Sequence, residues 1–381
     1  MEKQKNILII CGEASGDLNA ANLSCAIKEI NPYIKISGVG GTLMRQSQTE
    51  VFYDIKGLAV IGLFDVLKKL PKFFALKKLI LEKIKKDKID AIILVDFSGF
   101  NLRLAQAINN SIPVIYYVSP QVWASRKGRL KTIKKYVRKM IVLFKFEEEF
   151  YKEHGIDVDF AGHPLLDIVR PTIVKREFLN KYQLCEDKTT IALLPGSRKA
   201  EIKNILPLML KTAILIKKKI GDIQFIVAKS SQVDWDIYNR IICKFCLDLK
   251  VVEDKTYDCL EAADFCLVAS GTATLETAIM QKPFFVIYKM GLLNYLLYRP
   301  QIKVPYIGMV NIVAKDLIAR EFIQFKATPK NISIEAIKII EDPNEMERLK
   351  NGLKQIKRLL GEKGAVNRAA RIILEFLENA S

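Results

Sequence analysis

The chain has 381 residues, more than a single hydrophobic core usually fills, so two domains are expected. Half of the residues are hydrophobic and 27% are charged, a composition that excludes a disordered chain. His154 and His163 are the only histidines, which excludes a histidine-rich metal site. The formal charge of +18 points to nucleic acid, a membrane surface or an anionic substrate as partner; a lysine-rich composition without any such partner is the alternative.

The start of the chain predicts no signal peptide, because its charged residues run directly into a short apolar strand at 7–10. The longest uncharged run, 104–125, predicts no transmembrane helix, because Pro113 and Pro120 interrupt it. Seven cysteines without an export signal predict reduced thiols, and the C-x-x-C pair at 243–246 is interpreted as part of an apolar core. We therefore expect a cytoplasmic protein.

The first half of the chain alternates short apolar strands with helical stretches. Its predicted strands are 6–11, 34–39, 91–95, 114–118 and 140–144. A helix is predicted between the first two strands, ending near residue 30. Apolar strands separated by helices are typical of a parallel sheet that is covered on both faces.

The same pattern restarts after residue 171 and predicts a second sheet. Its strands are 190–194, 224–227, 250–252, 265–268 and 284–288, with a helix at 205–219, and the segment 344–378 is predicted to be helical with a break at 361–364. The predicted fold class is therefore α/β, with two Rossmann-like doubly wound domains that face each other across a cleft. We place the domains at 1–167 and 168–343, followed by a C-terminal helical tail at 344–381.

The loop 12–17 follows the first predicted strand and opens a helix. Gly12 and Gly16 allow a ligand to approach the backbone, and the start of the helix offers free N–H groups to an anion. The alternative is that Ser15 or Asp17 only caps the helix. The loop does not have the G-x-G-x-x-G spacing, so it does not favour a nicotinamide or flavin cofactor.

The segment 193–202 opens the second domain in the same way. Pro195 and Gly196 form the turn, Ser197 can cap the helix, and Arg198 brings a forked cation to the helix start. Such an arginine suits a diphosphate because it binds two oxygens at once. An exposed capping loop with an incidental arginine is the alternative.

The segment 269–276 is the third strand-to-helix turn of this kind. Its small and hydroxyl-bearing residues predict a pocket for phosphate oxygens, with Glu276 as acceptor for two ribose hydroxyls. The alternative for Glu276 is a favourable charge at a helix start. The residues concerned are Ser270, Gly271, Thr272, Thr274 and Glu276.

Asp96 stands at the carboxyl end of a predicted buried strand, where α/β folds place their ligands. A carboxylate at such a position predicts a functional role. Asn101 follows it closely, and Gln121 and Trp123 end the next strand, so these side chains are candidates for the same cleft.

Seven motifs in order along the chain together resemble the lipid-A-disaccharide synthase family. They are GEASGD (12–17), DFSGFN (96–101), SPQVWA (119–124), GHP (162–164), LPGSR (194–198), SGTATLE (270–276) and GMVNI (308–312). Each motif alone is weak, but the ordered set covers nearly the whole chain and is specific. The resemblance implies an inverting glycosyltransferase of the GT-B type.

The resemblance also implies the substrates. The donor would be UDP-2,3-diacylglucosamine and the acceptor 2,3-diacylglucosamine 1-phosphate, giving a β-1,6-linked disaccharide 1-phosphate and UDP. UDP would bind the second domain, on the loops of Arg198 and Glu276 and near Asn311, and the acceptor would approach the first domain. Some members carry a further aspartate where this chain has Gly99, which leaves Asp96 as the nearby base.

Preorganised donors with Arg198 would stabilise the leaving UDP, so no metal and no cofactor are expected. The D-x-D sequence at 157–159 precedes an interdomain turn and is therefore not interpreted as a metal site. The nearest alternatives are a transferase of the same fold with another lipid-linked sugar acceptor and a sugar-nucleotide epimerase. A basic membrane-binding or nucleic-acid-binding protein without activity is the third, and the absence of any nucleic-acid-binding module disfavours nucleic acid.

Two segments predict contact with an anionic membrane surface, which would make the protein peripheral to the inner membrane. The first, 58–88, interleaves apolar residues and lysines around Pro71. The second is 291–300, and both could instead form acyl-chain grooves. The alternative for the first is an amphipathic helix that covers the sheet. The residues of the first segment are Leu63, Phe64, Leu67, Leu70, Phe73, Phe74, Leu76, Ile80 and Ile84, with Lys68, Lys69, Lys72, Lys77 and Lys78.

Overall fold

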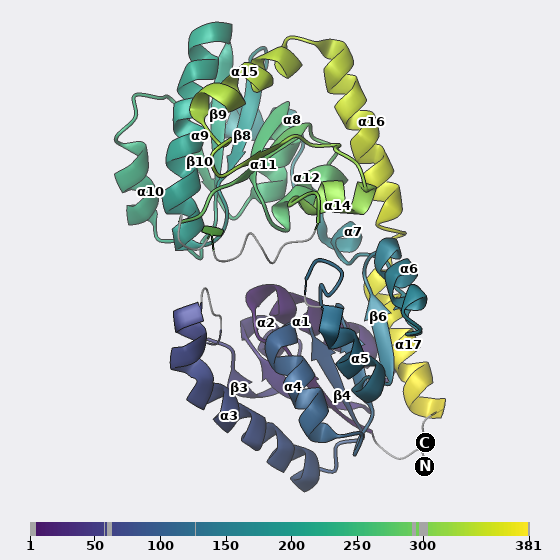
Figure 1. Cartoon of the computed structure of the whole chain (residues 1–381). Helices are drawn as coiled ribbons and strands as arrows, with labels where there is room; N and C mark the ends of the chain where they lie inside the picture. Colours follow the sequence, from purple (N-terminus) through teal and green to yellow (C-terminus); the bar gives the residue numbers. More distant parts are fainter. Residues whose placement is uncertain are drawn as a thin grey trace. The chain divides into compact units, whose positions relative to one another are not determined.

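The computed structural model describes residues 5–56, 58, 63–125, 127–291, 295–296 and 304–379, with the backbone alone at 63–69. The chain divides into two compact units. Unit 1 comprises the residues up to Pro164 together with those from Leu360 to the C-terminus, and unit 2 comprises Leu165–Leu359. Each unit contains one parallel sheet with helices packed against it, which confirms the predicted α/β class (Figure 1).

Unit 1 contains a seven-stranded parallel sheet with the order β3-β2-β1-β4-β5-β6-β7. Its strands are β1 (Asn6–Ile10), β2 (Lys35–Gly40), β3 (Glu50–Asp54), β4 (Ala91–Val95), β5 (Val114–Tyr117), β6 (Lys139–Val142) and β7 (Asp159–Phe160). Its helices are α1 (Ala14–Ile30), α2 (Thr42–Gln46), α3 (Leu63–Lys86), α4 (Ser98–Ile108), the 3-10 turn η1 (Lys127–Arg129), α5 (Leu130–Tyr136), α6 (Lys145–Glu153) and α17 (Ala365–Asn379).

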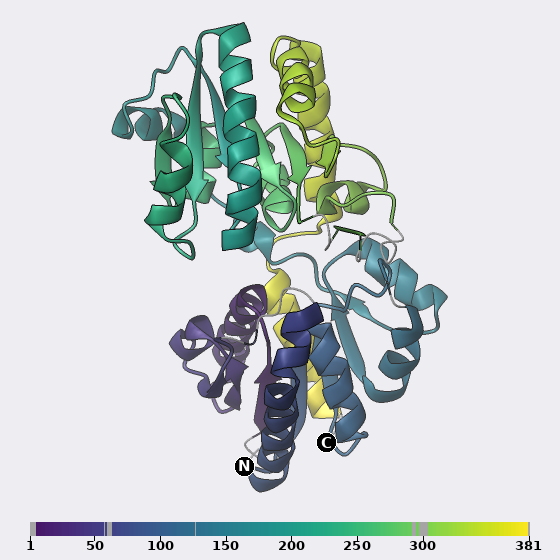
Figure 2. The same ribbon diagram turned by 60° about the vertical axis from the view of Figure 1, so that its left-hand side comes forward.

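The core of unit 1 follows from the apolar strands. Every residue of β4 is buried, as a central strand covered on both faces requires. Figures 1 and 2 both show α3 and α4 side by side on one face of the sheet. On this face Leu8 and Leu94 of the strands pack with Ile80 of α3 and Leu104 of α4.

Unit 2 contains a six-stranded parallel sheet with the order β10-β9-β8-β11-β12-β13. Its strands are β8 (Thr189–Leu194), β9 (Ile223–Lys229), β10 (Lys250–Glu253), β11 (Phe265–Ala269), β12 (Phe284–Tyr288) and β13 (Glu321–Ile323). Its helices are α7 (Leu165–Ile168), α8 (Lys175–Lys181), α9 (Lys199–Ile220), α10 (Trp235–Ile242), α11 (Thr256–Ala262), α12 (Ala273–Ile279), α14 (Met309–Ala314), α15 (Pro329–Ile340) and α16 (Pro343–Leu359).

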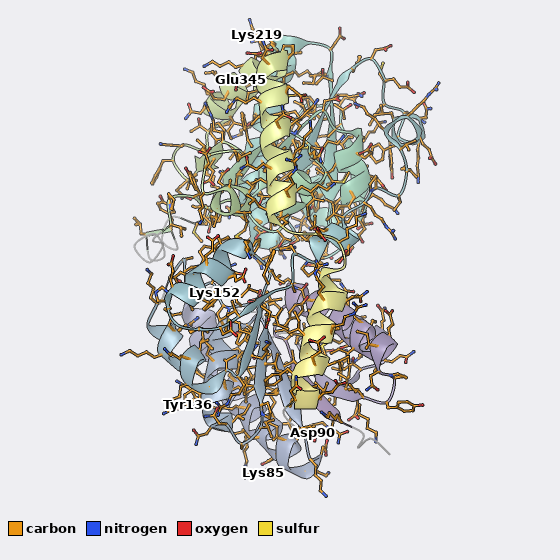
Figure 3. The ribbon with its side chains drawn as sticks, turned by 90° about the vertical axis from the view of Figure 1, so that its right-hand side faces the viewer. Lys85, Asp90, Tyr136, Lys152, Lys219 and Glu345 are labelled. Atoms are coloured by element: carbon orange, nitrogen blue, oxygen red, sulfur yellow. The ribbon has the colours of Figure 1, made fainter. Side chains whose placement is uncertain are left out.

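The segment predicted as a single tail is divided between the units. Figure 3 shows α16 and α17 as two separate helices, with Glu345 in the first turn of α16. The break falls at 360–364, which agrees with the predicted break at 361–364. In unit 1, α17 packs against α1 and buries Ala369, Ile373 and Leu377, whereas α16 belongs to unit 2. The apolar stripe of each helix therefore completes a different core.

Two predicted strands, β4 and β12, agree with the structure at both ends. Three strands were not predicted: β3, β7 and β13. They lie at or next to the edges of their sheets and have five, two and three residues. Each of these edge strands begins with an acidic residue and is mostly only partly buried, so no apolar run marks it in the sequence.

The interpretation of Cys243 and Cys246 as core residues is wrong, because both are exposed. The helix α10 ends at Ile242, and the turn that follows packs only partly against the core of unit 2, through Phe245. Both thiols are therefore open to solvent.

For the segment 58–88, the structure supports the covering of the sheet: Leu76 and Ile80 of α3 are buried. Two other apolar side chains of the same helix are exposed, Phe74 by 61% and Leu79 by 39%. The side chains of 63–69, and residues 292–294 and 297–300 of the second segment, lie outside the described residues. None of the helices in the described part of the chain combines the length and apolar character that a membrane crossing needs.

Candidate active site

Most of the predicted site residues lie in the loops and first helical turns that follow strands of the two sheets, whereas Asn311 lies in α14. The order in which successive strands join the parallel sheet changes direction between β1 and β4 in unit 1, and between β8 and β11 in unit 2. Open α/β sheets bind ligands in the crevice at such a reversal, because the adjacent loops there turn to opposite sides. In unit 1, Asp96 and the loop 12–17 lie at this point; in unit 2, the loops 195–198 and 270–272 do.

Asp96 stands on a strained turn directly after β4. Asp96 and Phe97 both adopt left-handed backbone conformations, with φ of 49° and 45°, at a cost of about 1–3 kcal/mol each. The carbonyl oxygen of Asp96 accepts a hydrogen bond of 2.5 Å from the Tyr116 hydroxyl and one of 2.9 Å from the Asn101 amide. These two side chains hold the turn and so orient the Asp96 carboxyl.

Burial and, to a smaller extent, the negative charge of Glu13 together raise the pKa of the half-buried Asp96 to about 6, against the opposing effect of the backbone N–H of Phe97. A carboxylate of this kind is largely ionised at neutral pH and is more basic than an exposed one. Both properties suit a general base. Glu13 lies inside the predicted loop 12–17 but was not selected from the sequence, because its effect on Asp96 depends on the approach of two strand ends.

The loop 12–17 combines close packing with one exposed hydroxyl. A Cβ at Gly12 would lie 2.3 Å from the ring of Phe97, so only glycine allows this approach. Gly16 is buried and Ser15 is exposed. Asp17 accepts hydrogen bonds from the backbone N–H groups of 41, 43 and 44, at 2.7, 3.0 and 3.3 Å. Asp17 therefore caps α2, and not the helix α1 in which it lies.

Asn101 is fully buried, and its amide group donates to the carbonyl oxygens of Val95 and Asp96. Its place is thus inside the turn, where it supports Asp96, and not on an open surface. The exposed Gly99 lies on the same turn, and a Cβ there would meet nothing within 4 Å. A larger side chain at 99, such as the aspartate that the family resemblance implies for other members, therefore has room.

The turn after β5 exposes Gln121 and half-buries Trp123. The indole N–H of Trp123 donates to Oε1 of Glu147 at 3.0 Å, and the Ser119 hydroxyl donates to the same oxygen at 2.8 Å. The sequence did not single out Glu147, which stands in the acidic run 147–149 at the start of α6 and looks like an ordinary helix-start charge. Only its burial distinguishes it.

In unit 2, the turn after β8 is closed by Glu201 of α9. Gly196 has φ of 107°, and the Glu201 carboxylate accepts from the backbone N–H groups of Ser197 and Arg198 at 3.2 and 3.3 Å. The Arg198 guanidinium also contacts Glu201, at 3.2 Å, but its side chain is 57% exposed. Arg198 and the N–H groups of this turn therefore already surround one carboxylate, a geometry that suits anions in general.

The turn after β11 carries the other predicted residues of unit 2. Gly271 and Thr272 are exposed, Ser270 is half-buried, and Thr274 is buried with its hydroxyl donating to the Gly271 carbonyl at 2.8 Å. Glu276 accepts a hydrogen bond of 3.1 Å from the hydroxyl of Tyr257. Burial raises the pKa of Glu276, and this hydrogen bond opposes the rise.

Glu276 also borders a cavity within unit 2. Its volume is about 280 Å³, and its wall combines cationic, acidic and hydroxyl side chains. Sequence reasoning did not find the other lining residues, which come from the segment after α7 and from the β10–α11 turn. They are Arg170, Thr172, Asp254, Lys255, Thr256, Tyr257 and Asp258.

Asn311 is fully buried and satisfied inside the fold. Its side chain donates to the Ala319 carbonyl at 2.7 Å and to Glu321 at 2.8 Å, and accepts from the Ala319 N–H at 2.9 Å. Glu321 in turn accepts from the backbone N–H groups of Ile307 and Gly308. Asn311 thus holds the 307–308 turn, whose carbonyl at Ile307 lies 3.4 Å from the Ser270 hydroxyl.

Within the described ranges, no group of three or more histidine, cysteine, aspartate or glutamate side chains is placed to hold a metal ion. Asp159 of the D-x-D sequence lies in β7, where its carboxylate pairs with Lys139 of the neighbouring strand at 2.5 Å. This pairing gives Asp159 a structural role.

Comparison with known proteins identifies the family. A family model described as lipid-A-disaccharide synthetase matches residues 7–376. The lipid-A-disaccharide synthase of Syntrophus aciditrophicus is 41% identical over 99% of both chains, and that of Geobacter sulfurreducens is 38% identical over 97% of both. The chain belongs to this family. Members of the family are glycosyltransferases, so the chain is a hexosyltransferase, as the ordered motifs predicted.

Solved structures of low sequence similarity share the fold. A UDP-N-acetylglucosamine 2-epimerase, so described, from Listeria monocytogenes is similar with a TM-score of 0.66 at 12% identity, covering 99% of this chain and 98% of that chain. MurG of Acinetobacter baumannii is similar with a TM-score of 0.56 at 13% identity, covering 97% and 99%. These likenesses confirm the GT-B type of the two Rossmann-like units.

Proposed function

We propose that the chain transfers the sugar of UDP-2,3-diacylglucosamine to 2,3-diacylglucosamine 1-phosphate and forms the β-1,6-linked lipid A disaccharide 1-phosphate and UDP. The membership of the lipid-A-disaccharide synthetase family supports this reaction. The single structural observation that carries it is the position of Asp96. This carboxylate, with a pKa near 6, follows β4 at the point where the strand order of unit 1 changes direction. The reaction requires one base for one hydroxyl proton, and Asp96 meets that requirement.

Unit 2 is proposed to bind the UDP-sugar. The exposed guanidinium of Arg198 can bind two diphosphate oxygens, and the N–H groups of 197 and 198 face the same point. The diphosphate would take over the contacts that Glu201 now makes. The hydroxyls of Ser270 and Thr272 and the backbone of Gly271 add further donors, and the cavity beside Glu276 offers room for the nucleoside.

Unit 1 is proposed to bind the acceptor and to start the reaction. Asp96 accepts the proton of the attacking hydroxyl, which bonds to the anomeric carbon as the bond from that carbon to UDP breaks. A base in hydrogen-bond reach contributes about 10²–10⁴-fold to the rate. Attack from the face opposite UDP inverts the anomeric centre, through an oxocarbenium-like state. Ser15, Gly16, Gln121 and Trp123 are proposed to contact the acceptor.

The donors of unit 2 are proposed to stabilise the departing UDP, so that the reaction proceeds without a divalent metal or other cofactor. Negative charge grows on the diphosphate as the bond breaks, and preorganised donors act on that charge at no further cost of reorganisation. Removal of one such donor typically costs about 3–4 kcal/mol of transition-state stabilisation. Arg198 is the strongest of these donors because it is charged.

Diacylated substrates partition into membranes, and we propose a peripheral contact with the anionic surface of the inner membrane. The outer side of α3 supports this contact, because Phe74 and Leu79 are exposed beside Lys72 and Lys78. Apolar side chains among lysines favour the interface of an anionic bilayer. The formal charge of +18 suits the same surface and the phosphate of the acceptor.

The proposal is tested by the release of UDP from UDP-2,3-diacylglucosamine in the presence of chelator. We expect UDP and a disaccharide phosphate to form only when 2,3-diacylglucosamine 1-phosphate is present. A requirement for added metal would contradict the proposed chemistry. Turnover with only another lipid-linked sugar would assign the other acceptor class, and a 2-epimer of the donor formed without acceptor would assign an epimerase instead.

A further inference from the structure

Glu147 is a buried acid in unit 1 that the proposed reaction does not use. It lies in the first turn of α6 and is 3% exposed. One carboxylate oxygen, Oε1, accepts two hydrogen bonds, from the Ser119 hydroxyl at 2.8 Å and from the Trp123 indole N–H at 3.0 Å. In the part of the chain that the structure describes, no lysine, arginine or histidine forms an ion pair with it. Burying a carboxyl group without a cation costs free energy, so the hydrogen bonds that Glu147 accepts must compensate for its burial.

Among the ionisable side chains around Glu147, its own carboxyl is the one whose pKa lies near 7. Burial raises its pKa to about 7, against the opposing effect of its hydrogen bonds. The next residue, Glu148, is turned toward Lys145 and Lys152, which lower the pKa of Glu148. Burial lowers the pKa of His163, which lies beyond Phe144, to about 4, so that this histidine is neutral in the same range.

Tyr151, one turn along α6, is the remaining titratable group beside Glu147. Its hydroxyl donates to the carbonyl of Pro120 at 3.0 Å, and burial together with the Glu147 charge raises its pKa well beyond the physiological range. Two side chains of α6 therefore hold the turn after β5: Glu147 at Ser119 and Trp123, and Tyr151 at Pro120. This turn begins at Val118, a β-branched residue with φ of 63°, a conformation that needs support from its surroundings.

The Trp123 ring that Glu147 holds is the start of an aromatic row. Trp123 meets Phe146 edge to face with ring centroids 5.1 Å apart, and Phe146 stacks on Phe144 at 5.4 Å. Trp123 and Phe146 are both half-buried and so present part of their rings. Such rings suit the apolar face of a sugar or the first carbons of an acyl chain. The orientation of this surface depends on the hydrogen bond to Glu147.

We propose that Glu147 is a positioning residue that holds the Trp123 ring and the Ser119 turn in the orientation that receives the acylated acceptor sugar. Oε1 of Glu147 accepts hydrogen bonds from Ser119 and Trp123, the two ends of the segment 119–123. The carboxyl group therefore fixes the conformation of this segment. Glu147 itself touches no substrate. The acceptor part of this inference rests on the proposed function, whereas the coupling of Glu147 to Trp123 does not.

The first test compares Glu147→Gln with the matched control Glu149→Gln, which makes the same change at an exposed position of α6. UDP release is measured while acceptor and donor are varied separately. We expect Glu147→Gln to raise the KM for 2,3-diacylglucosamine 1-phosphate by about 5–10-fold, the worth of one hydrogen bond, and to leave the KM for the donor within about twofold. Unchanged acceptor KM, or an equal change in both KM values, overturns the positioning role.

The second test does not depend on turnover. The chain has two tryptophans, Trp123 and Trp235, so Trp235→Phe leaves Trp123 as the only one. In this background we expect the emission of Trp123 to shift with pH around 7, and we expect Glu147→Gln to abolish the shift. An emission that titrates equally with and without Glu147 overturns the coupling. If Glu147→Gln fails to fold, Ser119→Ala, which removes one donor from Oε1, is measured in the same background and must move the midpoint.

The two tests separate this inference from the proposed function. An emission titration that depends on Glu147, in a protein that releases no UDP with any acceptor, supports the coupling and counts against the proposed reaction. Normal turnover with an emission that does not depend on Glu147 supports the reaction and overturns the inference.

Discussion

At the scale of single residues, the chemistry depends on groups whose properties the fold has changed. Asp96 is basic because it is desolvated and lies near the charge of Glu13. Arg198 is 57% exposed at a helix start, where its guanidinium contacts the Glu201 carboxylate at 3.2 Å. Asn311, in contrast, is hydrogen-bonded at both ends of its amide inside the fold, and the amide nitrogen of Asn101 donates to two carbonyl oxygens of its own turn. Asp96 and Arg198 are therefore proposed to act on the substrates, whereas Asn101 and Asn311 hold the turns of the backbone in place.

Replacement of Asp96 by Asn removes the base and keeps the size of the side chain. We expect turnover to fall by at least about 100-fold, because a positioned base contributes about 10²–10⁴-fold, while UDP binding to unit 2 stays measurable. Calorimetric titration with UDP and an assay of UDP release provide the two measurements. Near-normal turnover in Asp96→Asn would reject Asp96 as the base.

The pH dependence of kcat/KM reports the same group. Because the pKa of Asp96 is raised to about 6, its carboxylate is lost to protonation as the pH falls through 6, and a protonated carboxyl cannot accept the hydroxyl proton. We expect kcat/KM to fall about tenfold per pH unit well below 6 and to be level above it. An acid limb near 4, the usual range of an exposed aspartate, would contradict the raised pKa.

Replacement of Arg198 by Ala removes the charged donor proposed for the diphosphate. A hydrogen bond to a charged group contributes about 1.5–3 kcal/mol, so we expect the Kd for UDP to rise by at least about tenfold. The exposed Arg240 of α10, replaced by Ala, is the matched control and is expected to leave the Kd unchanged. Equal affinities of the Arg198 variant and the unaltered chain would remove Arg198 from the site.

At the scale of elements, the helices α1 and α3 each have a role beyond covering the sheet. The helix α2 is capped from another helix, because Asp17 of α1 accepts three of its free N–H groups. The helix α3 buries Leu76 and Ile80 and exposes Phe74 and Leu79, so its inner side stabilises unit 1 while its outer side is available to a membrane. A helix that only covers a sheet usually has polar residues wherever it meets solvent, so the exposed Phe74 and Leu79 distinguish α3 from such a helix.

The two sides of α3 predict separable effects. Replacing Phe74 and Leu79 by Ser is expected to weaken binding to vesicles rich in anionic lipid by about tenfold or more, with little change in melting temperature. Ile80→Ala is expected to destabilise unit 1 by about 2–5 kcal/mol without acting on the outer side. Vesicle sedimentation and thermal unfolding measure these effects. Equal vesicle binding by the double variant would remove this side of α3 from the proposed membrane contact.

At the scale of the whole molecule, the chain returns at its end to the unit with which it began. The C-terminal helix α17 belongs to unit 1 and packs against α1, although the chain reaches it only after completing unit 2. Arg368 of this helix donates to the carbonyl oxygen of Ala161 at 2.9 Å. Unit 1 therefore includes a helix that follows unit 2 along the chain.

The helix α17 should then stabilise unit 1 and not unit 2. Ile373 is fully buried, and we expect Ile373→Ala to cost unit 1 about 2–5 kcal/mol. Hydrogen exchange resolved by segment can assign the loss to one unit. Faster exchange in the strands of unit 1 with unchanged exchange in β8 and β11 is the expected result, and the reverse pattern would contradict this assignment.

The sequence by itself determined the fold class, most central strands and the strand-to-helix turns that carry the proposed site, because these depend on local patterns. Runs such as 91–95 are apolar throughout, and loops such as 270–272 carry small hydroxyl residues wherever they fold. The seven ordered motifs likewise sufficed to identify the family. The edge strands β3, β7 and β13 were not predicted, since each begins with an acidic residue and is mostly only partly buried, so that no apolar run marks it.

Only the tertiary structure decided which polar groups are buried and which remain open. Glu147 and Glu149 are neighbours in one acidic run, yet one is buried against Ser119 and Trp123 while the other is exposed. The basicity of Asp96 and the internal role of Asn311 were decided in the same way. Desolvation and hydrogen bonding depend on atoms that segments far apart in the chain bring together, and a local pattern does not contain those contacts.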